Sequence, residues 1–178
     1  MGEESKMERI VLGGGCFWCL DAVYRLVPGV ERVVTGYSGG HTVNPDYESV
    51  CTGKTGHAEV VQVQFDPSQV KLADLLDMFW RIHDPTTLNR QGADVGTQYR
   101  SVIFYTNDEQ RAVVDASVQQ AQGMYASPIV TQVAPLEAFY EAEEYHQDYF
   151  NRNPGAGYCV MVIAPKVRKA KAILGADR

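Results

Sequence analysis

The sequence lacks the long apolar run that a membrane-spanning helix requires. No stretch approaches the ~18 consecutive apolar residues of such a span, so no membrane partner is expected. Residues 1–7 are polar and acidic, which is unlike the apolar core of a secretory signal peptide. We therefore expect a cytoplasmic protein.

Clustered positive charge is also scarce. The chain has 16 Lys and Arg residues against 22 Asp and Glu residues, which gives a formal net charge of −6. Its one basic cluster, at 166–171, fits the solvated face of a last helix better than a nucleic-acid patch. No nucleic-acid partner is expected.

Cysteine is sparse as well, with four residues in 178: Cys16, Cys19, Cys51 and Cys159. In the cytosol these thiols are reduced at rest, so a disulfide between them is expected to be transient and catalytic. A structural zinc site usually needs a second close pair of ligands, and neither Cys51 nor Cys159 has one. The sequence therefore predicts no metal centre.

The composition is that of an ordinary soluble domain, with 45% hydrophobic and 21% charged residues. We expect one domain over 1–178, with a polar tail at 1–6 and a C-terminal segment at 151–178. Hydrophobic periodicity predicts strands at 7–12, 30–37, 57–65, 100–105 and 129–134, helices at 16–27, 70–83, 108–124, 142–150 and 166–174, and extended chain at 158–163. Some strands follow each other directly, which indicates an α/β (α+β) fold with helices packed on a mixed sheet.

Cys16 lies where a glycine turn, residues 13–15, meets a predicted helix. Free amide groups and the helix dipole favour an anion there, so the thiol pKa is expected to fall and the thiolate to act as a nucleophile. The glycines also allow an oxyanion to approach backbone N–H groups. Two alternatives remain: a buried cysteine that only packs, or a thioredoxin-like dithiol formed by Cys16 and Cys19.

Glu59 is in phase with Val61, Val63 and Phe65 in the predicted strand at 57–65. Alternation therefore directs the carboxyl group of Glu59 toward the apolar face. Desolvation there raises the pKa of this group, so that it holds a proton and can act as a general acid. The alternative is a glutamate that reaches back to solvent.

Two turn-rich segments hold further polar candidates. Tyr47 lies in residues 38–56, and Asp94 and Tyr99 lie in the long loop at 84–99. Each tyrosine alone is typical of a surface or packing residue. Together with Cys16 and Glu59 they can supply hydroxyl donors around an oxyanion.

Seven blocks of sequence closely resemble the peptide methionine sulfoxide reductase A family, and they occur in that family's order. They read GCFWC at 15–19, GYSGG at 36–40, NPDY at 44–47, GKTGHAEV at 53–60, HDPTT at 83–87, QGADVGTQYRS at 91–101 and GYC at 157–159. The resemblance covers nearly the whole chain. It implies a ferredoxin-like core and reduction of the S epimer of methionine sulfoxide, free or in proteins, without metal or organic cofactor.

The same resemblance assigns roles to single residues. Cys16 is the nucleophile that attacks the sulfoxide sulfur and becomes a sulfenic acid. Glu59 protonates the sulfoxide oxygen. Tyr47 and Tyr99 hold that oxygen, and Asp94 helps to position them or a water molecule.

The remaining roles concern the substrate methyl group and the second half of the cycle. Phe17 and Trp18 form the apolar wall that receives the methyl group. Cys159 is the resolving thiol, with Cys19 as the alternative, and thioredoxin reduces the resulting disulfide. The chain departs from the common family pattern at Cys19, where many members have Gly, and at Asp21, where many have Glu.

Overall fold

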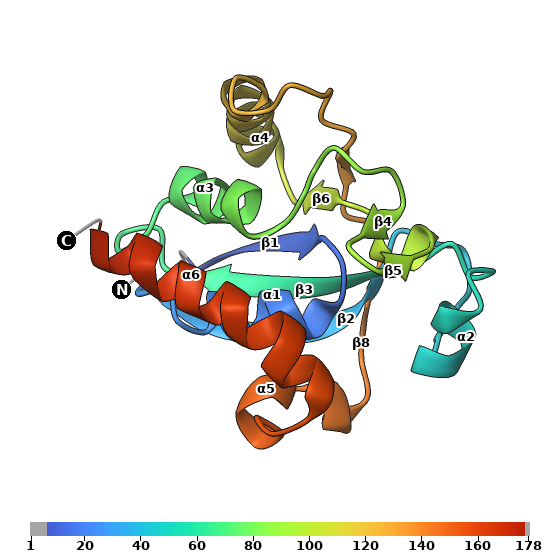
Figure 1. Cartoon of the computed structure of the whole chain (residues 1–178). Coiled ribbons are helices and arrows are strands. Elements are labelled where there is room, and N and C mark those ends of the chain that lie inside the picture. Colours follow the sequence, from blue (N-terminus) through green and yellow to red (C-terminus); the bar gives the residue numbers. More distant parts are fainter. Residues whose placement is uncertain (1–6, 177–178) are drawn as a thin grey trace.

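The computed structural model describes residues 7–176, so the polar tail expected at 1–6 lies outside the described residues. Figure 1 shows the helices gathered around a curved sheet, with α6 lying across α1. The strands are β1 (Glu8–Gly13), β2 (Val30–Ser38), β3 (Ala58–Phe65), β4 (Arg90–Gln91), β5 (Asp94–Val95), β6 (Val102–Tyr105), β7 (Gln132–Pro135) and β8 (Phe139–Glu141). The helices are α1 (Phe17–Tyr24), α2 (Tyr47–Cys51), α3 (Leu72–Ile82), α4 (Asp108–Gln122), α5 (Tyr149–Arg152) and α6 (Ala164–Ala176).

The main sheet has the strand order β7-β6-β1-β3-β2-β8. Its four central strands pair antiparallel, and α1 and α3 connect β1 to β2 and β3 toward β6. This βαββαβ arrangement is the ferredoxin-like pattern. β7 adds a parallel edge strand beside β6, so the predicted mixed sheet with helices packed on it is confirmed.

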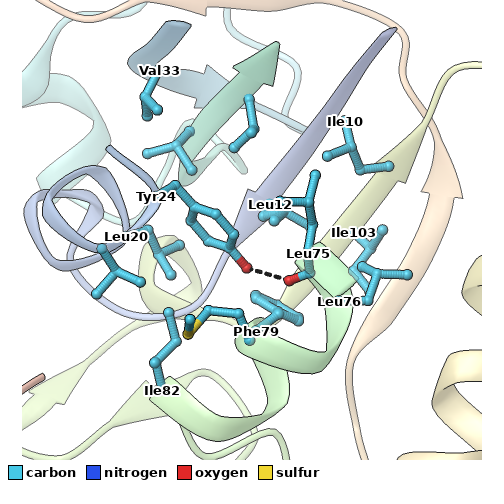
Figure 2. Packing of buried hydrophobic residues seen from close by; sticks show 14 of the residues in the cluster. Ile10, Leu12, Leu20, Tyr24, Val33, Leu75, Leu76, Phe79, Ile82 and Ile103 are labelled. Atoms are coloured by element: carbon cyan, nitrogen blue, oxygen red, sulfur yellow. Dashed lines mark hydrogen bonds between the residues drawn. The ribbon is translucent and has the colours of Figure 1, made fainter. Parts of the chain in front are cut away.

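The hydrophobic core lies between one face of the sheet and the helices α1 and α3. Figure 2 shows how Tyr24 of α1 crosses this core, where its hydroxyl donates a hydrogen bond of 2.7 Å to the carbonyl oxygen of Leu75 in α3. Residues of opposite phase, including Val11 and Val60, form a smaller cluster on the other face. The core therefore fixes α1, and with it Cys16, against the central strands.

Two expectations for the C-terminal third are wrong. Residues 142–150 do not form one helix: a 3₁₀ turn, Glu144–His146, is separated from α5 by Asp148, whose φ of 55° is left-handed. Asp21 holds this break by accepting a 2.8 Å hydrogen bond from the Asp148 backbone N–H.

Residues 158–163 are helical rather than extended. A π-helical turn, Cys159–Ile163, leads directly into α6. The short apolar run at 158–163 suggested extended chain, but Cys159, Ile163, Val167 and Ala170 recur at helical spacing and are all buried. Burial of that face decided the conformation.

Among the residues that the structure describes, no helix is long and apolar enough to cross a membrane.

Candidate active site

Cys16 is the N-cap residue of α1, with extended backbone angles of φ −66° and ψ 130°. The preceding Gly15 has a φ of 86°, which an L side chain rarely adopts. Its N–H donates a 3.1 Å hydrogen bond to the carbonyl oxygen of Tyr99. The glycine turn is thereby tied to the long loop that follows α3.

The thiol of Cys16 has a pKa well above its ordinary value, so the expectation of a lowered pKa is wrong for this state of the protein. Burial is the largest cause, followed by the charges of Glu59 and Cys19. A hydrogen bond from the Trp18 backbone acts in the opposite direction, as expected at a helix start, but it does not outweigh burial. The resting thiol is therefore protonated.

Glu59 projects from β3 into the core side of the sheet, as its phase predicted, and only 1% of its surface is exposed. One carboxyl oxygen, Oε1, accepts a 3.1 Å hydrogen bond from the Phe17 N–H, while Oε2 is buried with no partner. Burial raises the pKa from 4.5 to about 8; the Phe17 N–H lowers it and the charge of Asp94 raises it. At neutral pH the buried carboxyl group holds a proton.

Three further candidates interact electrostatically with Glu59, and they lie on separate elements: Tyr47 on α2, Asp94 on β5 and Tyr99 on a 3₁₀ turn. The charge of Glu59 helps to raise the pKa of both Tyr47 and Tyr99, after the larger effect of burial in each case. Asp94, in β5, accepts a 2.8 Å hydrogen bond from the hydroxyl of Tyr158. The two hydroxyl groups and the carboxyl group of Asp94 therefore lie within electrostatic range of Glu59.

Phe17 and Trp18 form an aromatic wall beside the thiol. Phe17 is fully buried, and Trp18 stacks on Tyr149 with ring centroids 3.7 Å apart and an interplanar angle of 7°. The indole Nε1–H donates a 3.0 Å hydrogen bond to Nδ1 of the buried His146. Both aromatic positions predicted from the sequence thus lie together.

The sequence reasoning missed three residues that support this wall: Glu143, His146 and Tyr149. His146 packs against the rings of both Phe17 and Tyr47, and Glu143 accepts a 2.8 Å hydrogen bond from the Tyr47 backbone N–H. Burial lowers the pKa of His146, which keeps the imidazole neutral and its Nδ1 free to accept from the indole. They lie in the segment at 142–150, where the sequence predicted a helix and gave no sign that these side chains face the site.

Both candidates for the resolving thiol, Cys19 and Cys159, are buried. Cys159 is fully buried at the start of the π-helical turn, and it shares an apolar cluster with Cys19. Cys16 packs instead against the main core. In this state Cys159 is held away from Cys16, because the helix that contains Cys159 packs against α1.

Cys51 lies at the exposed end of α2. Its thiol hydrogen-bonds with the hydroxyl of Tyr47. Within residues 7–176, the structure shows no cluster of three or more His, Cys, Asp or Glu side chains that could hold a metal ion.

A thiol at a helix start, next to a buried protonated carboxyl group and accompanied by two tyrosine hydroxyls, defines a thiol oxidoreductase with an α/β fold. Comparison with known proteins identifies the family. Residues 8–177 match the family model for peptide methionine sulfoxide reductase. The chain belongs to the peptide methionine sulfoxide reductase family and is an oxidoreductase.

Individual relatives agree with this assignment. The MsrA of Paenarthrobacter aurescens is 56% identical over 165 residues, which cover 93% of this chain and 95% of that protein. The reduced form of Mxr1 from Saccharomyces cerevisiae has a TM-score of 0.83 at 38% identity, covering 87% of this chain and 90% of that one. The structure of Mxr1 in complex with Trx2 has a TM-score of 0.60 at 29% identity, covering 82% and 86%. Family membership favours sulfoxide reduction over the thioredoxin-like dithiol alternative.

Proposed function

We propose that this enzyme reduces the S epimer of methionine sulfoxide, free or in proteins, through a sulfenic acid on Cys16. The observation that supports this most directly is the unpartnered, buried Oε2 of Glu59 beside the nucleophilic thiol. A carboxyl group kept protonated by burial can donate a proton to the sulfoxide oxygen while the sulfur is attacked. Selectivity for the S epimer rests on family membership.

Cys16 and Glu59 together supply the electrons and protons of the first step. The Cys16 sulfur attacks the sulfoxide sulfur, Glu59 protonates the oxygen, and that oxygen passes to Cys16 as a hydroxyl group. Methionine leaves, and Cys16 is oxidised to a sulfenic acid. The thiol proton of Cys16 returns to Glu59, so the acid is restored for the next turnover.

The hydroxyl groups of Tyr47 and Tyr99 are assigned to the sulfoxide oxygen. Burial and the nearby charge of Glu59 raise both tyrosine pKa values, so both remain proton donors throughout the working pH range. Such donors stabilise charge that develops on an oxygen in a site with little water. Asp94 accepts a hydrogen bond from the hydroxyl of Tyr158, and we assign to this pair the positioning of the two tyrosine donors.

The aromatic wall is assigned to the substrate methyl group. Phe17 is held by its place in the core, and Trp18 by its stacking on Tyr149 and its hydrogen bond to His146. Rings held in this way can align the sulfur of the substrate with Cys16, which favours attack.

In the second half of the cycle a thiol condenses with the sulfenic acid, which releases water and leaves a disulfide. We assign this role to Cys159, which requires the π-helical turn to unwind from α1. Cys19 remains the alternative, because it lies one helical turn from Cys16 and shares a cluster with Cys159. Thioredoxin is the proposed reductant, supported by the Mxr1 complex with Trx2.

Single-turnover reactions of four Cys→Ser variants with a resolved sulfoxide epimer test these assignments. Cys16→Ser should produce no methionine, and the variant of the resolving thiol should release one equivalent and then stall with thioredoxin. Cys51→Ser is the matched control: the serine hydroxyl can keep the hydrogen bond with Tyr47, so this variant should cycle normally. Stalling of Cys19→Ser together with normal cycling of Cys159→Ser would transfer the resolving role to Cys19.

A further inference from the structure

A hollow of the described structure reaches Cys16 and continues well beyond it. Its volume is about 780 Å³, and Cys16, Asp94 and Tyr158 contribute to its lining. That volume falls within the range of pockets that hold drug-sized ligands. Of the residues assigned to the reaction only Cys16 and Asp94 line it, so the hollow adjoins the place of the sulfoxide rather than containing it. The hollow can therefore accept the residues that flank the sulfoxide in a peptide.

Three cationic side chains line the same hollow: Arg81 from α3, and Lys166 and Lys169 from α6. The two lysines are three residues apart and so lie on the same helix face, which differs from the face that buries Val167 and Ala170. The charge of Lys166 acts on the site. Burial raises the pKa of Cys19, and the charge of Lys166 is the largest of the influences that lower it.

Two carboxylates also line the hollow, but each already has partners. Asp84 accepts hydrogen bonds from the backbone N–H of Thr86, at 2.9 Å, and from its hydroxyl group, at 2.6 Å. Asp94 accepts one from Tyr158. The structure gives no hydrogen bond or ion pair for the three cations within residues 7–176, in a chain whose net charge is −6.

We propose that this hollow is a peptide subsite that favours methionine sulfoxides with an acidic residue nearby in sequence. Tyr158 lines the hollow together with Cys16 and so marks the end at which the sulfoxide binds. Lys166 lies eight residues and Lys169 eleven residues after Tyr158 along a helical segment, so the two lysines are roughly 12–16 Å from Tyr158 along the helix axis. An extended peptide covers about 3.3 Å per residue, so the carboxylate belongs about four or five residues from the sulfoxide. The inference rests on the proposed function, whose substrate class it narrows.

Matched peptides test this subsite. Each contains one resolved methionine-S-sulfoxide and either Glu or Gln four residues away, on the N-terminal side in one pair and on the C-terminal side in the other. With dithiothreitol as reductant, one Glu peptide should show a kcat/KM about two- to ten-fold above its Gln partner. The preference should shrink in high salt, because screening weakens exposed charge pairs.

Variants separate this subsite from the overall charge of the protein. The double variant Lys166→Gln, Lys169→Gln should lose the preference for Glu. The matched control Arg168→Gln, Lys171→Gln removes the same charge from exposed positions of α6 that do not line the hollow, and should keep it.

The outcomes distinguish this subsite from the reaction itself. Equal rates for Glu and Gln peptides at both positions, or equal loss in both double variants, would overturn the subsite while reduction of free methionine sulfoxide continued. Failure to reduce the free amino acid at all would overturn the proposed function instead.

Discussion

Replacement of Glu59 by Gln separates the catalytic role of this side chain from its effect on folding. Glutamine has nearly the same shape, and its carbonyl oxygen can still accept the hydrogen bond from the Phe17 N–H. Its amide group cannot give up a proton. We therefore expect the single-turnover rate of methionine formation to fall about 10²–10⁴-fold, which is the usual contribution of a general acid.

The same change should make the protein more stable at neutral pH. The pKa of Glu59 is about 8 in the fold against 4.5 as its reference value, so folding at pH 7 requires the uptake of a proton. With about 1.36 kcal/mol per pH unit over the interval from 4.5 to 7, this uptake costs about 3 kcal/mol. Glutamine does not incur it, so Glu59→Gln should raise the free energy of unfolding by up to that amount.

The sign of the pH dependence follows from the raised pKa. The folded protein binds more protons than the unfolded chain between about pH 4.5 and 8, so wild-type stability falls as pH rises through this range. Below it the advantage of the glutamine variant should vanish. The catalytic rate should likewise decline above about pH 8, where Glu59 loses its proton.

Denaturant unfolding at several pH values, together with rapid-quench turnover, measures both effects. Glu48→Gln, at an exposed position of α2, is the matched control and should change neither quantity. Activity of Glu59→Gln within a few-fold of wild type would refute its role as the acid. Parallel stability curves for Glu59→Gln and wild type between pH 5 and 8 would refute the buried, protonated carboxyl group.

Three further predictions follow from the packing around the site. His146→Phe leaves the indole N–H of Trp18 without its acceptor, so KM should rise more than kcat falls. The free energy of unfolding, measured with denaturant, should drop by about 1–3 kcal/mol. An unchanged KM would contradict the role of His146 in positioning Trp18. Tyr24→Phe removes the hydrogen bond to Leu75 and should lower the unfolding free energy by about 1 kcal/mol with no change in single-turnover rate. Gly15→Ala forces a side chain into left-handed backbone, so both stability, by about 1–2 kcal/mol, and turnover should fall; normal turnover would show that the turn tolerates rearrangement.

The periodic parts of the fold could be predicted because each reflects burial of one face. Leu72, Leu75, Leu76 and Phe79 repeat at helical spacing and are buried in α3, within one or two residues of the predicted bounds. The segment at 142–150 could not be predicted in this way. Its turn depends on Asp21, more than a hundred residues earlier, which accepts the backbone N–H of Asp148.

The position of Cys16 at a helix start and the inward phase of Glu59 are local properties, so the sequence alone determined both, and with them the kind of chemistry. The protonation of the thiol, the support that His146 gives to Trp18, and the burial of Cys159 against Cys19 were decided by the tertiary structure. Each depends on desolvation or contact between residues distant along the chain, and no periodicity in the sequence records which segments will pack together.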